Sequence, residues 1–112
     1  MNLEVTLAGK TFKNPVTTAS GTFGSGAEYE QFVDLAALGA VTTKGVANVP
    51  WEGNPTPRVA ETYGGMLNAV GLQNPGVDRV ISDELPRLKE HFRKKVIANV
   101  SGFSIDEYVQ CA

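Results

Sequence analysis

The pattern of apolar and polar positions predicts a hairpin at the start of the chain. Leu3, Val5 and Leu7 alternate with polar neighbours, and residues 11–13 resume an extended pattern after a glycine. Period-two alternation on either side of such a turn is typical of two antiparallel strands. We therefore expect a β-hairpin that turns at Ala8-Gly9.

Beyond the hairpin, strand and helix signals alternate. Short runs of apolar and β-branched residues predict strands over 16–19, 40–43 and 95–100, and a glycine-rich loop over 20–26 follows the first of them. A long segment over 46–76 holds four of the six prolines. Long loops in compact domains are often functional, so we interpret this segment as a functional loop.

Three helices are expected between and after these strands. The first is indicated by apolar residues at i, i+3, i+4 and i+7, namely Tyr29, Phe32, Val33 and Ala36. The second covers 77–92 and should bend or restart near Pro86, because proline cannot donate a helical hydrogen bond. The third opens at a capping box formed by Ser104 and Glu107.

Strict alternation of strand and helix predicts the α/β class, with parallel strands joined by crossover helices. A doubly wound open sheet and a (β/α)8 barrel both fit this pattern. Three βα units are too few to close a barrel, which typically takes about 250 residues. The 112 residues are therefore expected to be the front part of a larger domain.

Composition and charge narrow the function classes. Ten Lys and Arg residues against twelve Asp and Glu give a net charge of -2, which argues against a nucleic-acid partner. One cysteine and one histidine exclude an intrachain disulfide and a Cys/His metal cluster. The N-terminus lacks a signal-peptide pattern and no apolar run is long enough for a membrane span, so we expect a cytoplasmic protein without a membrane partner.

Polar residues at the predicted strand ends are the candidates for chemistry, because parallel βα proteins carry their sites there. Lys44 is either a surface lysine or a cation facing an anionic substrate or a cofactor ring. Asn99 follows apolar strand residues and needs a hydrogen-bond partner or a ligand. The loop with Asn68 is either a plain turn or a set of amides suited to a planar ring bearing carbonyls and a carboxylate. Cys111 is expected to be a packed, inert thiol.

Several motifs resemble class 1 dihydroorotate dehydrogenases, especially the type 1B enzymes. The resemblance extends over essentially the whole chain, in order and with matching spacing. It is carried by Ala19-Ser20-Gly21, Thr43-Lys44-Gly45, the GNPTPRVAET stretch at 53–62, the MLNAVGLQNPG stretch at 66–76 and the IANV stretch at 97–100.

The resemblance implies a (β/α)8 TIM barrel whose bottom is covered by the N-terminal β-hairpin. Residues 1–112 would be the N-terminal part of one FMN-binding domain, namely the hairpin and the first three βα units. It also implies that FMN contacts Ser20, Gly21, Lys44, Gly45 and Asn99. Dihydroorotate or orotate would contact Lys44, Asn68, Ala69, Val70, Gly71 and Leu72.

The implied activity is oxidation of dihydroorotate to orotate in pyrimidine biosynthesis. The family's base is a cysteine in a later loop, so it is expected beyond Ala112 and these residues alone should be inactive. Type 1B enzymes pass electrons to a partner subunit that carries FAD and an iron–sulfur cluster, in a heterotetramer, and then to NAD; type 1A enzymes use fumarate. The alternatives are a dihydropyrimidine dehydrogenase-type FMN domain and a non-catalytic truncated fragment.

Overall fold

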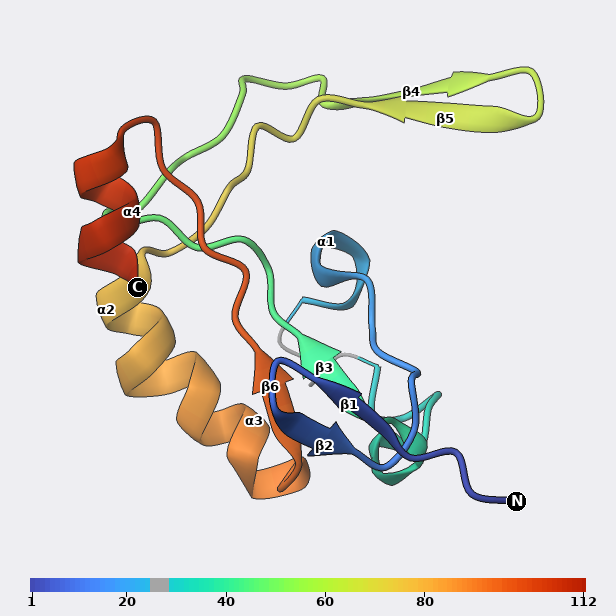
Figure 1. Cartoon of the computed structure of the whole chain (residues 1–112). Coiled ribbons are helices and arrows are strands. Elements are labelled where there is room, and N and C mark those ends of the chain that lie inside the picture. The colour runs from blue at the N-terminus through green and yellow to red at the C-terminus, as the bar shows by residue number, and fades with distance from the viewer. Residues whose placement is uncertain (25–28) are drawn as a thin grey trace.

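The computed structural model describes residues 1–24 and 29–112, which form a mixed α/β arrangement (Figure 1). Gly26 of the glycine-rich stretch lies outside the described residues. In chain order the elements are β1 (Val5–Leu7), β2 (Lys10–Phe12), α1 (Ser20–Phe23), the 3₁₀ helix η1 (Leu35–Ala37), β3 (Ala40–Thr42), β4 (Val59–Thr62), β5 (Gly65–Asn68), α2 (Val77–Arg79), the π-helical η2 (Val80–Glu84), α3 (Leu85–His91), β6 (Lys95–Ile97) and α4 (Ile105–Cys111).

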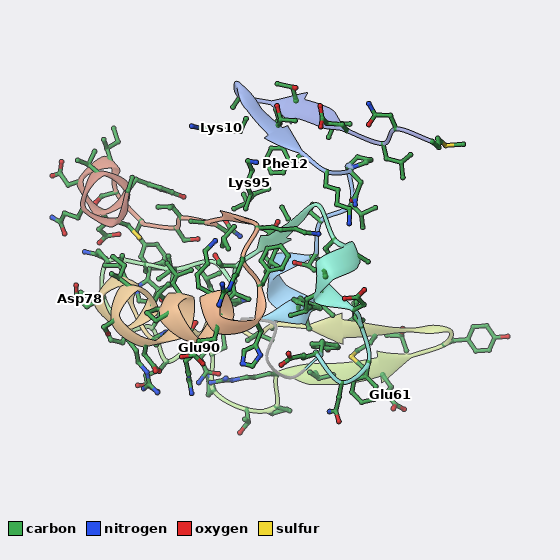
Figure 2. The ribbon with its side chains drawn as sticks, turned by 90° about the horizontal axis from the view of Figure 1, so that it is seen from below. Lys10, Phe12, Glu61, Asp78, Glu90 and Lys95 are labelled. Atoms are coloured by element: carbon green, nitrogen blue, oxygen red, sulfur yellow. The ribbon has the colours of Figure 1, made fainter. Side chains whose placement is uncertain are left out.

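The N-terminal hairpin has the predicted turn. Strands β1 and β2 pair antiparallel, with Val5 opposite Phe12. Ala8 and Gly9 have φ values of 49° and 69°, and a two-residue turn with positive φ at both positions matches the right-handed twist of the strands. The Lys95 ammonium at the start of β6 lies 5.4 Å from the centroid of the Phe12 ring (Figure 2), so the hairpin contacts the sheet that follows it.

The second sheet is parallel, as the alternating pattern predicts. Strands β3 and β6 pair in parallel, with Val41 opposite Val96. Residues 16–18 lie on the other side of β3, joined by a parallel bridge between Thr17 and Ala40. Three chain segments therefore run side by side in one direction.

The first predicted strand, over 16–19, is reduced to this single bridge. The reason is local, because Thr42 N donates to the Thr18 hydroxyl at 3.0 Å instead of to a main-chain carbonyl. A side-chain acceptor of this kind competes with the ladder. The loop expected over 20–26 begins instead with one helical turn, α1.

The helix predicted over 77–92 is present as the continuous run α2, η2 and α3 (Figure 1). Leu85 N bonds to Val80 O, five residues back, and Pro86 stands in the first turn of α3. Proline has no N–H to continue the ordinary ladder, so the wider π turn is where the helix admits it. The predicted bend or restart near Pro86 takes the form of a switch from π-helix to α-helix at Leu85, within a continuous run.

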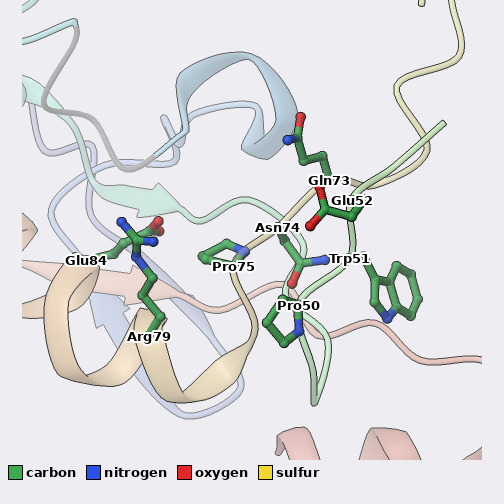
Figure 3. A pocket seen from close by; sticks show the side chains of 8 residues that line it. All are labelled: Pro50, Trp51, Glu52, Gln73, Asn74, Pro75, Arg79 and Glu84. Atoms are coloured by element: carbon green, nitrogen blue, oxygen red, sulfur yellow. The ribbon is translucent and has the colours of Figure 1, made fainter. Parts of the chain in front are cut away.

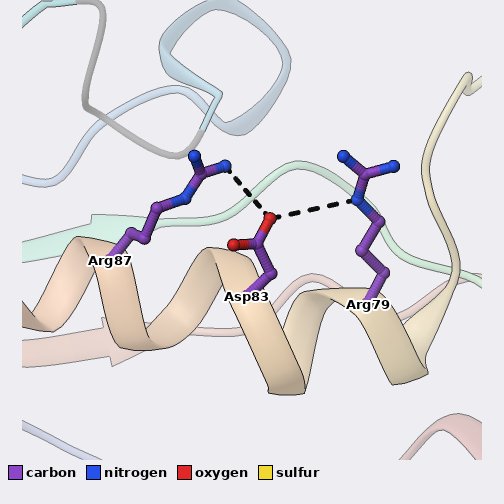
Figure 4. Close-up of polar contacts among 3 residues, drawn as sticks. All are labelled: Arg79, Asp83 and Arg87. Carbon is purple, nitrogen blue, oxygen red and sulfur yellow. Dashed lines mark hydrogen bonds and ion pairs between the residues drawn. The ribbon is translucent and has the colours of Figure 1, made fainter.

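The exposed face of this helix carries an ion-pair group (Figure 4). Asp83 lies 4.0 Å from Arg79 and 3.1 Å from Arg87, each four residues away. All three side chains are well exposed, and exposed pairs at this spacing contribute little, about 0.3–0.5 kcal/mol. They mark the solvated side of the helix.

The predicted helix over 29–36 is wrong. The described residues there form turns and the short helix η1, whose N-cap Asp34 accepts a hydrogen bond from Ala36 N at 2.9 Å. Aspartate favours such caps over a helix interior, so Asp34 interrupts the run that the apolar spacing suggested. Phe32 is consequently 75% exposed, while Leu35 is buried.

Two small clusters form the core between the parallel sheet and the α2–α3 helix. The first contains Phe23, Leu35, Leu38, Val41, Leu88 and Phe92. The second contains Val46, Val80 and Cys111. The Cys111 thiol donates to Val46 O at 3.3 Å, which agrees with the expected packed thiol. No helix in the described ranges is both long and apolar enough to cross a bilayer.

The segment predicted as a loop over 46–76 contains a second hairpin. Strands β4 and β5 pair antiparallel, with Val59 opposite Asn68, and project from the body of the molecule (Figure 1). Every residue of both strands is exposed. The sequence did not predict these strands for two reasons. Prolines and glycines flank them, and neither face of the hairpin is buried, so the apolar–polar alternation that usually indicates a strand is weak.

Candidate functional site

Three of the predicted site residues meet at one edge of the parallel sheet. Ser20, Lys44 and Asn99 each follow one of the three parallel segments, and the carboxyl ends of parallel segments share an edge. Asn99 Nδ2 donates to Ser20 Oγ at 3.2 Å. A methyl group added at Gly21 would lie 3.7 Å from Lys44 Nζ. The structure therefore gathers a hydroxyl, an ammonium and an amide.

Lys44 lies in a bulge of the parallel ladder. The β3–β6 register pairs Thr42 with Ile97, which would place residue 45 opposite Val100. Val46 pairs with Val100 instead, so one extra residue is accommodated on the β3 side. Asn99 N donates to the Thr43 hydroxyl at 3.2 Å within this stretch. Bulges redirect side chains and are common beside active sites.

Asn99 is exposed rather than buried, because β6 ends two residues before it. Its amide donates to the Ser20 hydroxyl, which is the hydrogen-bond partner that the sequence led us to expect. The side chain is accessible at the strand edge, where a ligand could also reach it.

Gly45 lies where three segments come close. A methyl group added there would be 2.8 Å from Leu72 Cδ1 and 3.0 Å from Ser101 Oγ. Leu72 was predicted as a site residue, whereas Ser101 was missed. Ser101 could have been found from the sequence, because it lies two residues past Asn99 in a loop that follows a strand.

The remaining predicted residues lie at the base of the second hairpin. Asn68 and Ala69 line a separate shallow pocket with Arg58. Two hydrogen bonds from Asn54 hold the chain here, from its N to Val70 O at 3.0 Å and from its Nδ2 to Ala69 O at 2.9 Å. The predicted substrate-binding residues are therefore found in two places. Lys44 and Leu72 lie at the strand-edge cluster, and residues 68–70 lie at the base of the second hairpin.

Arg58 connects the GNPTPRVAET stretch at 53–62 with the MLNAVGLQNPG stretch at 66–76. Its guanidinium donates to Gln73 Oε1 at 2.7 Å and to Glu52 O at 2.8 Å, and its Nε donates to Asn54 O at 2.5 Å. Five rigid donors suit arginine to such multiple contacts. The GNPTPR stretch therefore supports the stretch that contains Asn68 and Leu72.

Replacing Gly71 by alanine should destabilise this loop by about 2 kcal/mol, against about 1 kcal/mol for Gly64→Ala. Both glycines have positive φ, 77° and 74°. A methyl group at Gly71 would lie 2.6 Å from Asn54 N, whereas one at Gly64 meets nothing within 4 Å. Urea unfolding of both variants in the full-length protein measures the difference, and equal losses would contradict the proposed clash with Asn54.

Among the described residues, no three His, Cys, Asp or Glu side chains gather into a group that could hold a metal ion. The cluster instead offers donors: an ammonium, hydroxyls and an amide. Parallel strands with polar side chains at their carboxyl ends define an α/β protein, whose strand edge is the candidate ligand site.

The family follows from comparison with known proteins. A family model described as dihydroorotate dehydrogenase matches residues 2–112. The chain belongs to the dihydroorotate dehydrogenase family.

Two curated relatives are both named dihydroorotate dehydrogenase B (NAD(+)), catalytic subunit. The protein from Lachnoclostridium phytofermentans is 69% identical over 110 residues, and the one from Alkaliphilus metalliredigens is 59% identical over 110 residues. Each alignment covers 98% of this chain and 36% of the relative. The chain therefore spans about a third of the length of these relatives.

Solved structures agree in fold. A ligand-free DHODH from Eimeria tenella superimposes with a TM-score of 0.65 at 22% identity, covering 95% of this chain and 33% of that one. A second structure from the same organism, in complex with ferulenol, has a TM-score of 0.63 at 24% identity, covering 88% of this chain and 28% of that one. At such identities the likeness supports the fold alone.

Proposed function

We propose that this chain is the first part of an FMN-dependent dihydroorotate dehydrogenase, which oxidises dihydroorotate to orotate in pyrimidine biosynthesis. Residues 1–112 would supply the hairpin and the first three βα units of a TIM barrel. The supporting observation is the meeting of Ser20, Lys44 and Asn99 at one strand edge in a member of this family. A cytoplasmic location remains a prediction.

The strand-edge cluster suits a flavin ring. Gly21 carries no side chain and lies beside the Lys44 ammonium, so a flat ring can approach the backbone closely there. Ser20 and Asn99 offer hydrogen-bonding groups, and Lys44 offers a positive charge for the electron-rich edge of the ring. FMN, when bound, supplies a two-electron acceptor for the hydride that leaves the substrate.

We propose that the substrate contacts the same strand edge and the loop 68–72, as the family resemblance implies. Lys44 would pair with the carboxylate of dihydroorotate, and the Asn68 amide with its ring carbonyls. Backbone N–H groups of residues 69–72 would orient the ring. We propose that the base that removes the substrate proton is the family's later cysteine, outside residues 1–112. Cys111 is a poor candidate, because it is buried and bonded to Val46 O.

The names of the two curated relatives indicate which electron acceptor to expect. Both are NAD(+)-type catalytic subunits, which supports a partner subunit over direct reduction of fumarate. We propose that this partner carries FAD and an iron–sulfur cluster and that the assembly is a heterotetramer.

Expression of the full-length protein tests the function. We expect a yellow protein whose flavin is identified as FMN and is bleached by dihydroorotate under anaerobic conditions. Dihydrouracil is the matched control, because it lacks the carboxylate that Lys44 would pair with, and it should bleach the flavin far more slowly. Faster bleaching by dihydrouracil would favour a dihydropyrimidine dehydrogenase-type domain. A protein without flavin, or one reduced by neither compound, would contradict the proposal.

A further inference from the structure

Asn74 is a buried amide that joins two segments around the site, the one with Ala47 and Trp51 and its own. The residue is only 6% exposed. Its Oδ1 accepts from Ala47 N at 3.1 Å and from Gly76 N at 3.0 Å, and its Nδ2 donates to Leu72 O at 2.8 Å. Its backbone N donates to Trp51 O at 3.1 Å, and its backbone O accepts from Trp51 N at 3.0 Å. Figure 3 shows Asn74 between the residues of these segments, in the wall of a pocket.

The acceptor side of this amide fixes the segment that follows Lys44. Ala47 is three residues beyond Lys44, immediately after the bulge. Ala47 is fully buried, so its N–H has no water to replace the Asn74 oxygen. Asn74 Oδ1 therefore determines where this end of the Lys44 segment lies.

The donor side of the amide fixes Leu72. This residue has φ of 54°, which a non-glycine residue adopts only when its surroundings hold it there. The hydrogen bond from Asn74 Nδ2 to Leu72 O supplies one such restraint. It holds the Leu72 side chain in the space next to Gly45, where an added methyl group would be 2.8 Å away.

We propose that Asn74 is a positioning residue, whose amide sets the substrate loop 68–72 against the Lys44 segment. The inference rests on the proposed function, since it concerns the binding of the same substrate. Asn74 itself touches neither Lys44 nor the reacting atoms. It acts by joining the two segments that carry the ligand-binding groups.

The test compares Asn74→Asp with Asn14→Asp in the full-length protein. Aspartate at 74 keeps both acceptor contacts but places an oxygen against Leu72 O. Asn14 is a matched control, because it is also buried and also joins two segments, with Nδ2 2.8 Å from Ala37 O and Oδ1 3.0 Å from Val16 N. Asn74→Ser serves as a second variant that introduces no buried charge.

The measurements are thermal unfolding, calorimetric titration with orotate, and steady-state kinetics with dihydroorotate. We expect the Asn74 variants to bind orotate about tenfold more weakly and to raise KM by a similar factor, with kcat lowered less. Asn14→Asp should lower the unfolding temperature without changing orotate binding. Orotate binding by Asn74→Asp equal to that of Asn14→Asp would overturn the inference.

Two further outcomes are informative. If both Asn74 variants fail to fold while Asn14→Asp folds, Asn74 is a determinant of the fold and the positioning role is wrong. If the unmodified protein neither binds orotate nor oxidises dihydroorotate, the proposed function fails first, and the positioning role falls with it.

Discussion

Replacing Lys44 by alanine in the full-length protein will weaken dihydroorotate binding about ten- to hundred-fold and will also lower turnover. Lys44 is the cation at the strand-edge cluster, beside Gly21 and the Ser20–Asn99 pair. A charge-assisted contact to a carboxylate is worth roughly 1.5–3 kcal/mol. Because the same ammonium would also face the flavin edge, kcat should fall together with the affinity.

Steady-state kinetics and orotate titration measure both effects. Lys10→Ala is the control, since Lys10 is an exposed lysine on β2 of the N-terminal hairpin (Figure 2). Its removal should leave both constants unchanged. Kinetic constants for Lys44→Ala that match those of Lys10→Ala would make Lys44 a surface residue.

The isolated 112-residue chain will neither bind FMN tightly nor oxidise dihydroorotate. The largest fully buried side chains of the described residues are Phe92 and Val41, so the core is small. Leu7, Met66 and Leu67 are each more than 60% exposed. A core this limited leaves little stability after the loss of chain entropy, and exposed strand edges favour aggregation.

An apolar pocket under the N-terminal hairpin supports this expectation. It is lined by Val5, Thr6, Leu7, Phe12, Pro15, Thr17, Ala40 and Ile97. In a closed barrel, side chains of other strands would fill such a space. Size-exclusion chromatography and flavin absorbance after desalting test the isolated chain, with the full-length protein as control. A yellow, monomeric product bleached by dihydroorotate would show that the site is complete within these residues.

Local chemistry in the sequence was enough to predict several elements. Ala8-Gly9 predicts its turn, because few sequences accept positive φ at two successive positions. Ser104 predicts the start of α4, where its hydroxyl accepts from Glu107 N at 3.3 Å. The long apolar stripe of 77–92 predicts a helix, and Pro86 marks where it is irregular. Each of these depends on residues close together in the chain.

Competition between nearby signals explains the wrong helix. Tyr29 and Phe32 have helical spacing, but Asp34 caps a separate short helix that begins at the buried Leu35. Tyr29 is held instead by stacking on Phe23, with ring centroids 5.1 Å apart. Periodicity records the average character of a stretch, whereas one capping side chain can end a helix within it.

By itself, the sequence determined the parallel α/β order, the first hairpin and the placement of Ser20, Lys44 and Asn99 after strand segments. Only the tertiary structure decided that Lys44 lies in a bulge, that Leu72 packs beside Gly45 and that Asn74 joins their two segments. These features depend on contacts between residues more than 20 positions apart, such as Asn74 with Ala47. Local propensities and periodicity carry no record of such pairings, because the geometry that satisfies a buried amide exists only once the segments have come together.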